Sequence, residues 1–275
     1  MIKSVAIQGV KGSFHHIVSQ NYFSEDTYIL ECLSFDRAVE SLINEETDAV
    51  VIAIENSIAG SIIPNYALID NENLHIVGEQ YLDIQHNLMA LPNQSLNDIK
   101  EVYSHPMALL QCKEFFKNHP HIKLVEDKDT AEVAERIQKH QIRGIAAIAS
   151  TLAAELFELE ILAPSIQTIT HNETRFVIVK RENHEIPESE INKASIKFDV
   201  DHKRGSLAAL LNVMSDCKLN LTKIQSLPKI ETPWKYAFFV DVTFESYDDF
   251  KKAKSIINIM AHNFKVLGEY KNAKL

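Results

Sequence analysis

A threonine and an arginine at the start of one apolar run are the residues of this chain best placed to do chemistry. Thr174 and Arg175 stand between the polar segment 171–173 and the run 176–179. That run is rich in β-branched residues, which predicts a buried strand fed by a polar loop. A strand of this kind holds a hydroxyl and a guanidinium in place while the loop leaves them open to a ligand. The alternative is that Thr174 is a strand former and Arg175 a surface ion-pair residue.

A second polar cluster follows a different apolar run. Residues 48–54 are typical of a parallel strand covered on both faces, and Glu55, Asn56 and Ser57 come directly after them. Ligands of open α/β sheets bind beyond the carboxyl ends of the strands. The pattern therefore indicates a ligand site, and a turn with a helix cap is the alternative.

Two expected helix starts add neutral hydrogen-bonding groups. Ser104 fits as the N-cap of a helix whose first turn contains Pro106, and Gln111 lies near two turns further on, so both could face one cavity. Ser13 follows a glycine-containing turn after the first expected strand, where backbone N–H groups can hold an anion. A plain strand-to-helix turn would explain the Ser13 segment equally well, and an exposed helix face would explain Gln111.

The elements that must position these residues change in pattern along the chain. Up to residue 180, expected strands alternate with expected helices, which predicts an α/β domain. Its last strand, at 174–179, comes well after the middle units, so we expect two lobes with that strand returning to the first. Residues 181–194 are typical of a linker. The remainder has the order βαββαβ of a ferredoxin-like domain. The expected domains are 1–182 and 194–275.

Composition narrows the classes of protein and site. The 275 residues are 45% hydrophobic and 24% charged, enough for two cores. A net charge of −10 without a basic stripe argues against a nucleic-acid partner. No apolar run suits a membrane span, and the N-terminal segment indicates a strand and not a signal peptide. Cys32, Cys112 and Cys217 are too scattered for a disulfide framework or a paired-cysteine metal site, so we expect a cytoplasmic protein without a metal.

Several motifs, in their order and spacing, carry a resemblance to a known family. They are GVKGSF, AIENSIAGS, SHPMALLQC, DTAEVAERI with GIAAIAS, NETRF, and GSLAALLNVMSDCKLNLTKIQSLP. Over nearly its full length the chain resembles monofunctional prephenate dehydratases, which carry a C-terminal ACT regulatory domain. The resemblance implies a two-lobed α/β domain like the type II periplasmic binding proteins, with the site in the cleft. It also implies conversion of prephenate to phenylpyruvate, carbon dioxide and water, without a cofactor.

The resemblance assigns roles to the residues singled out above. The family's essential threonine falls on Thr174, which is expected to hydrogen-bond or relay a proton to the leaving ring hydroxyl. Strand alternation puts Arg175 opposite it, so Arg175 either supports the lobe through an ion pair or bends in at the strand start. The expected catalytic set is Thr174, Glu55, Asn56 and Gln111. The expected substrate-binding set is Ser57, Ser104, Ser13, Arg175 and Phe176.

The expected regulatory motif departs from the family. The usual Glu-Ser-Arg-Pro is Gln225-Ser226-Leu227-Pro228 here, and the usual Gly-Ala-Leu is Gly205-Ser206-Leu207. We still expect phenylalanine to bind and inhibit, because backbone groups can hold its charged ends. The alternative is a domain kept for assembly alone. The expected effector contacts are Gly205, Ser206, Leu207, Asn220, Leu221, Gln225 and Ser226.

Two further expectations concern assembly and activity. ACT-type sheets commonly pair, so a homodimer or a tetramer is expected. The rival to the dehydratase is a small-molecule sensor with the same fold and no turnover. A narrower rival is a dehydratase that prefers arogenate to prephenate.

Overall fold

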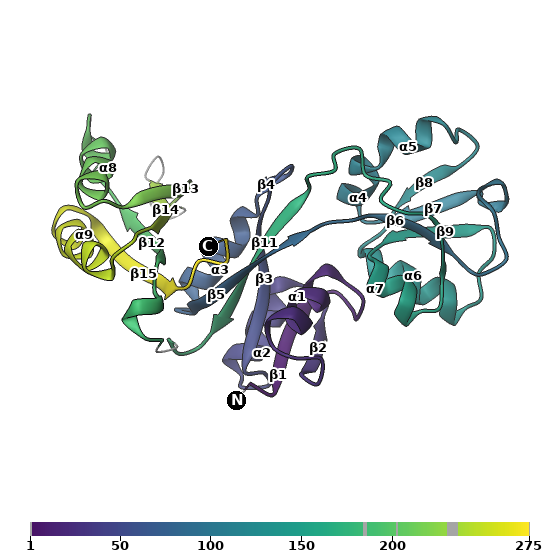
Figure 1. The fold of residues 1–275 in the computed structure, drawn as a ribbon, viewed down its shortest axis with the longest axis horizontal. Coiled ribbons are helices and arrows are strands. Elements are labelled where there is room, and N and C mark those ends of the chain that lie inside the picture. Colours follow the sequence, from purple (N-terminus) through teal and green to yellow (C-terminus); the bar gives the residue numbers. More distant parts are fainter. Residues whose placement is uncertain (1, 184–185, 202, 230–235, 275) are drawn as a thin grey trace. The chain divides into compact units, whose positions relative to one another are not determined.

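The computed structural model describes residues 2–183, 186–201, 203–229 and 236–274 (Figure 1). The chain divides into two compact units, one of Met1–Gly60 with Leu82–Phe176, the other of Ser61–Tyr81 with Val177–Leu275. This partition differs from the boundaries expected at residues 182 and 194, because residues 61–81 and 177–182 group with the C-terminal part. Those domain boundaries stay a prediction.

The first lobe of unit 1 is built on parallel strands. β1 (Ser4–Gln8) pairs with β2 (Tyr28–Cys32) and with β3 (Ala49–Asn56), and the helices are α1 (Phe14–Tyr22) and α2 (Phe35–Ile43). The hydroxyl of Ser34 accepts from Arg37 N at 3.2 Å and so caps the start of α2. Apolar residues of β3 are buried throughout, as a strand covered on both faces requires.

The second lobe of unit 1 is a sheet with helices on both faces (Figure 1). Its strand order is β10-β6-β9-β7-β8. Leu88 and Ile148 pack with α4 and α5, whereas Met89 and Ala147 pack with α6 and α7. This is the alternation that a pleated strand imposes. The elements are β6 (Asn87–Ala90), η1 (Leu96–Asp98), β7 (Glu101–Ser104), α4 (Pro106–Gln111), α5 (Lys113–Lys117), β8 (Lys123–Glu126), α6 (Thr130–Lys139), β9 (Ile145–Ala149), α7 (Thr151–Leu156) and β10 (Glu160–Ala163).

Three strands run through the points where the chain passes from one unit to the other. They are β4 (Gly60–Ser61), β5 (His75–Asp83) and β11 (Glu173–Lys180). The first sheet has the order β2-β1-β3-β11-β5, with β4 paired to β3. β11 is buried from Thr174 to Val179. The expected return of this late strand to the first sheet is therefore confirmed.

Unit 2 contains the expected βαββαβ succession. Its antiparallel sheet has the order β13-β14-β12-β15, and residues of its two long helices, such as Leu210 and Phe250, pack in one core with Phe198 of the sheet. The elements are α3 (Ile63–Asn71), η2 (Glu188–Glu190), β12 (Lys193–Asp199), α8 (Ser206–Asp216), β13 (Asn220–Pro228), β14 (Tyr236–Thr243), α9 (Tyr247–Met260) and β15 (His262–Tyr270).

Lysines of the unit 2 sheet bind polar groups of the segment 61–81. Lys193 Nζ donates to both carboxylate oxygens of Glu79 at 2.8 Å, and both side chains are buried. Asp70 accepts from Lys197 and Lys265, at 2.5 and 3.0 Å. A buried carboxylate needs such a partner, so these lysines fix the segment to the sheet.

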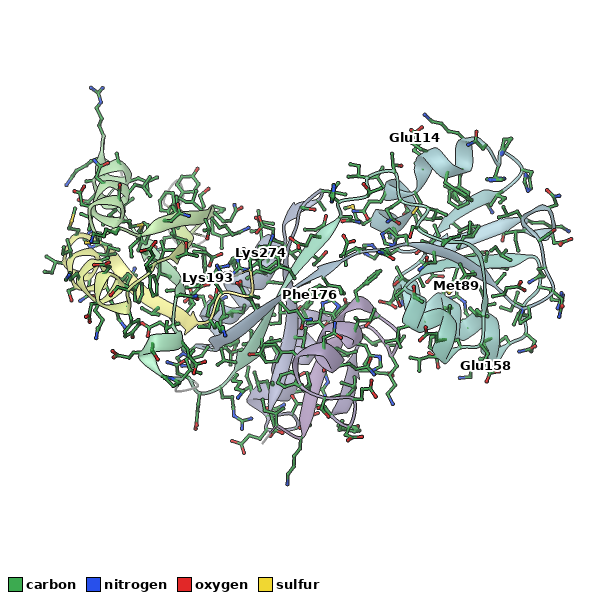
Figure 2. The ribbon with its side chains drawn as sticks, in the orientation of Figure 1. Met89, Glu114, Glu158, Phe176, Lys193 and Lys274 are labelled. Atoms are coloured by element: carbon green, nitrogen blue, oxygen red, sulfur yellow. The ribbon has the colours of Figure 1, made fainter. Side chains whose placement is uncertain are left out.

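Aromatic and backbone contacts add to this attachment. Lys193 and Lys274, both labelled in Figure 2, lie over the ring of Tyr81. Their Nζ atoms are 5.6 and 4.2 Å from the ring centroid. A Cβ atom on Gly268 of β15 would lie 2.1 Å from the carbonyl oxygen of Ile76. The two backbones can approach this closely only because the residue is glycine.

Candidate active site

The loop that follows β3 fixes the orientation of one amide. The side-chain oxygen of Asn56 accepts from the backbone N–H groups of Ile58 and Ala59, at 3.0 and 2.8 Å. A backbone N–H can only donate, so the atom facing it must be the carbonyl oxygen of the side chain. The Nδ2 group of Asn56 therefore points the other way, toward β11.

That Nδ2 group meets the hydroxyl singled out in the sequence. It donates to Asn172 Oδ1 at 2.7 Å and to Thr174 Oγ1 at 2.9 Å. Thr174 Oγ1 acts as an acceptor in this bond, so its own proton remains for another acceptor. Among the described residues, the Thr174 hydroxyl has no acceptor of its own. The structure therefore brings the expected residues Asn56 and Thr174 together with the hydroxyl proton uncommitted.

Donor and acceptor atoms can be assigned in the same way for the side chains that lead to the second lobe of unit 1. Because Asn172 Oδ1 accepts from Asn56, its Nδ2 donates to Gln111 Oε1 at 2.9 Å. Gln111 Oε1 also lies 2.8 Å from His86 Nε2, and an oxygen acceptor requires a donor there. His86 is thus the tautomer with its proton on Nε2. A continuous chain of side chains runs from His86 through Gln111, Asn172 and Asn56 to Thr174.

Burial sets the charge state of the one titratable side chain in this hydrogen-bonded series, His86. Asn172 is fully buried, and His86 is 4% exposed. Burial lowers the pKa of His86, against a smaller opposing effect of its hydrogen bond to Gln111. The imidazole is therefore neutral at neutral pH. The series His86, Gln111, Asn172, Asn56 and Thr174 therefore carries no charge at neutral pH.

Two expectations about Ser104 are wrong. Ser104 ends β7, and the N-cap of α4 is His105, whose Nδ1 accepts from Met107 N at 3.2 Å. The Ser104 hydroxyl is fully buried and donates to the carbonyl oxygen of Ile148 at 2.7 Å. Ser104 and Gln111 therefore do not share a helix, and the Ser104 hydroxyl already serves the sheet. A substrate contact through another atom of Ser104 stays a prediction.

Three further expected residues lie close to the chain of side chains, in different settings. Ser57 clamps the start of β11, because its Oγ accepts from Glu173 N at 2.9 Å and its N donates to Glu173 O at 2.8 Å. Glu55 is half-buried at the end of β3. Arg175 is 3% exposed, so the surface alternative for it is wrong. Roles for Glu55, Ser57 and Arg175 in binding or catalysis stay predictions.

Phe176 and Ser13 support the site from within the fold. Phe176 is 1% exposed and packs edge-on against His15, with ring centroids 5.0 Å apart. Its expected contact with substrate conflicts with this burial. Ser13 caps α1 by accepting from His16 N at 3.3 Å, as expected for a helix start.

The turn before α1 packs tightly against the second lobe of unit 1. The hydroxyl of Ser150 donates to Gly12 O at 2.6 Å. Gly12 has φ of +87°, and a Cβ atom there would lie 3.0 Å from Ala153 Cα. A side chain is excluded by both conformation and space, so this glycine serves the contact between lobes.

The expected effector residues lie at the start of α8 and along β13 of unit 2. Gly205 is the N-cap of α8 with φ of +85°, a conformation that favours glycine. Gln225 is half-buried on the outer strand β13, and its Nε2 donates to Ser226 O at 2.9 Å. Effector binding at any of these positions stays a prediction. The others are Ser206, Leu207, Asn220 and Leu221, all partly or fully exposed.

Within the described part of the chain, no group of three or more His, Cys, Asp or Glu side chains is placed to hold a metal ion. None of the helices in those residues is both long and apolar enough to cross a membrane.

The sequence did not reveal the roles of two members of the side-chain network. Asn172 stood in the stretch first singled out but received no role, and His86 was not singled out at all. Both lie on connections between the lobes of unit 1, where neither helical nor strand periodicity marks a functional position. No local signal distinguishes His86, because it stands between two other polar residues, Gln85 and Asn87.

Comparisons with known proteins identify the family of this chain. Residues 5–184 match the family model described as prephenate dehydratase. A bifunctional chorismate mutase/prephenate dehydratase of Buchnera aphidicola is 31% identical over 275 residues, covering 97% of this chain and 70% of the relative. Arogenate dehydratase/prephenate dehydratase 2 of Arabidopsis thaliana is 34% identical over 276 residues, covering 97% of this chain and 72% of the relative.

A solved structure supports the fold. Prephenate dehydratase from Arthrobacter aurescens, in complex with L-Phe, superposes with a TM-score of 0.87 at 24% identity, covering 98% of this chain and 90% of that one. The expected fold class is thereby confirmed. Since the family model spans most of the chain and curated relatives exceed 30% identity over nearly all of it, this chain belongs to the prephenate dehydratase family.

Proposed function

We propose that the chain is a lyase that converts prephenate to phenylpyruvate in phenylalanine biosynthesis. The observation that carries this proposal is the hydrogen bond from Asn56 Nδ2 to Thr174 Oγ1, at 2.9 Å. It holds the hydroxyl oxygen as an acceptor and leaves its proton for a ligand. A positioned neutral donor is what the departing ring hydroxyl requires.

The reaction needs little beyond positioning. The C–C bond to the ring carboxylate breaks, carbon dioxide departs, and the electron pair enters the ring as the C–O bond to the hydroxyl breaks. The leaving oxygen takes up one proton to become water. Thr174 donates a hydrogen bond to that oxygen as negative charge develops on it, and solvent supplies the proton in net balance. The aromatic ring that forms drives the step.

The side-chain amides of Gln111 and Asn56 orient the substrate in this proposal. The carbonyl oxygen of Gln111 faces the protein interior, so its Nε2 group is the end left for a substrate carboxylate. Fixed dipoles of this kind stabilise an anion without reorganising during the reaction. We assign Gln111 and Asn56 to orientation and Thr174 to the leaving hydroxyl.

The direct test is turnover. Purified protein is incubated with prephenate while phenylpyruvate is followed, and with arogenate while phenylalanine is followed. Product from prephenate supports the proposal, and faster turnover of arogenate would reassign the substrate. Binding of prephenate without product would favour the sensor. Thr174→Ser, which keeps the hydroxyl, and Thr174→Val, which keeps the shape, form a matched pair, and only the first should retain activity.

We further propose feedback inhibition by phenylalanine at the βαββαβ fold of unit 2, in a homodimer or tetramer. The Arthrobacter aurescens neighbour holds L-Phe in a chain of the same fold, which supports this ligand. The outer strand β13 carries Asn220, Leu221, Gln225 and Ser226 and offers an edge to a second copy. Turnover against phenylalanine concentration and sedimentation at micromolar protein test the two parts.

The three cysteines support a reducing compartment such as the cytoplasm. Cys32, Cys112 and Cys217 are all free thiols. Burial raises the pKa of Cys112 to about 12, which keeps this thiol unreactive.

A further inference from the structure

We propose that His86 is a positioning residue that holds the Gln111 amide with its N–H groups toward the substrate. This inference rests on the proposed function, since it concerns the same reaction. His86 does not reach Thr174 itself, and it acts on the substrate only through Gln111.

The contacts of Gln111 leave one arrangement. Its Oε1 accepts from His86 Nε2 at 2.8 Å and from Asn172 Nδ2 at 2.9 Å, which occupies both lone pairs of the oxygen. Its Nε2 group has no hydrogen-bond partner among the described residues, and it is not one of their buried unsatisfied atoms. The N–H groups are therefore open to solvent or ligand. A rotation of the amide by 180° would turn a carbonyl oxygen toward an anionic substrate.

His86 is held rigidly enough to direct its neighbour. Its backbone N donates to Gln167 Oε1 at 2.9 Å, and its carbonyl oxygen accepts from Ile166 N at 2.8 Å. Its ring packs edge-on against Phe14, with centroids 5.8 Å apart. The donor on Nε2 thus has a fixed position from which to meet Gln111.

The other ring nitrogen supports the same tautomer. Nδ1 of His86 is buried and has no hydrogen-bond partner among the described residues. A proton on Nδ1 would be a buried, unsatisfied donor, which is costly, and the lowered pKa of His86 disfavours a doubly protonated ring. A buried polar ring is tolerated here because its single N–H is used on Gln111.

The size of the effect follows from what remains when His86 is replaced. Asn172 still donates to Gln111 Oε1, so the preferred amide orientation is weakened and not lost. One net hydrogen bond corresponds to about 3- to 10-fold in an equilibrium constant. We expect His86→Phe to lower kcat/KM for prephenate, and its binding affinity, by about that factor. His86→Gln can place a donor near the Nε2 position and should recover much of the loss.

A double-mutant cycle separates positioning from packing. His86→Phe, Gln111→Ala and the double variant are compared in kcat/KM and, by calorimetry, in prephenate affinity. If His86 acts through Gln111, His86→Phe causes no further loss in the Gln111→Ala background. His15→Phe, which replaces another buried imidazole of unit 1 outside the network, is the control and should be additive with Gln111→Ala.

Several outcomes would overturn the inference. Equal losses from His86→Phe in both backgrounds would show that the ring only packs, as would wild-type activity and affinity in His86→Phe. Should that variant fail to fold, His86→Asn replaces it. Its shorter amide comes near the Nδ1 position, so it should lose activity where His86→Gln retains it. The affinity cycle needs no turnover, so an inactive wild type would overturn the proposed function while His86 is still tested.

Discussion

Replacing Asn56 by aspartate inverts one hydrogen bond without changing the shape of the side chain. The retained oxygen can still accept from Ile58 N and Ala59 N, at the positions now 3.0 and 2.8 Å from Oδ1. The second oxygen replaces Nδ2, so an acceptor now faces Asn172 Oδ1 and Thr174 Oγ1. The Thr174 hydroxyl can satisfy this carboxylate only by donating its proton to it. We therefore expect the hydroxyl to be turned away from the leaving group.

The expected magnitudes follow from the two hydrogen bonds that Asn56 Nδ2 donates. Removing this donor strips Asn172 Oδ1 of a 2.7 Å bond in a fully buried position, which costs about 1–3 kcal/mol of unfolding free energy. Withdrawing the assistance at the leaving hydroxyl should lower kcat by roughly 10²-fold or more. Asn56→Ala should lose less in kcat, because the hydroxyl of Thr174 stays free to turn toward substrate.

The assay is kcat against pH for wild type, Asn56→Asp and Asn56→Ala, with thermal melting of each. Desolvation raises the pKa of a buried carboxyl, and the protonated form can donate one hydrogen bond as the amide did. Activity of Asn56→Asp relative to wild type should therefore rise as pH falls. A folded Asn56→Asp variant with wild-type kcat at pH 8 would refute the orientation assigned to Thr174.

Four further changes test separate parts of the structure. Thr174→Ala should lower kcat by roughly 10²-fold or more with little change in melting, and near-normal turnover would remove the hydroxyl from the mechanism. Burial lowers the pKa of His15 to about 3, so between pH 6.5 and 3 the unfolded chain binds a proton that the folded chain does not. Unfolding free energy, measured in urea, should fall on acidification through that window by up to about 1.4 kcal/mol per pH unit, and His15→Phe should lack this contribution; identical slopes would contradict the burial of a neutral ring. Lys193→Met should destabilise the protein by about 3–5 kcal/mol because Glu79 stays buried, and calorimetry should show a smaller loss when Glu79→Met is added. Gly205→Val forces a β-branched residue to φ of +85° and should abolish phenylalanine inhibition while turnover remains; unchanged inhibition would place the effector elsewhere.

Local sequence patterns predicted the elements well. The β-branched run 176–179 lies in a buried strand, Ser13 stands at the start of α1, and the succession βαββαβ holds in unit 2. Each of these rests on periodicity or on a cap within a few residues, which physical chemistry ties directly to local conformation. The bond between Asn56 and Thr174 also follows, because both were expected near strand ends of one sheet.

Long-range partners decided the rest. The hydroxyl of Ser104 reaches the carbonyl of Ile148, a residue 44 positions away, and that acceptor cannot be seen from the local Ser-His-Pro pattern. His105 then caps the helix in its place. His86 gains a purpose only because Gln111 lies against it in space. Such pairings depend on how the lobes of unit 1 pack, which no local propensity encodes.

The lysine contacts between the unit 2 sheet and residues 61–81 bear on how domains can be exchanged among relatives. A cut in the expected linker at 181–194 looks harmless in the sequence. It would, however, separate Glu79 from Lys193 and Asp70 from Lys197 and Lys265. A replacement sheet would have to supply cations for the carboxylates of Glu79 and Asp70. It would also need a glycine at the position of Gly268, where the backbone of Ile76 comes close.

Exchange of the C-terminal domain between relatives therefore depends on two stretches that are distant in the sequence, residues 61–81 and 177–275. A transplanted C-terminal domain would have to bring α3 and most of β5 with it, although these lie over a hundred residues upstream of β12. A chimera that exchanges residues 61–81 together with 177–275 keeps every one of these ion pairs. Inheritance of the βαββαβ fold in this family member is thus tied to residues 61–81, which lie in the sequence between the two stretches of unit 1.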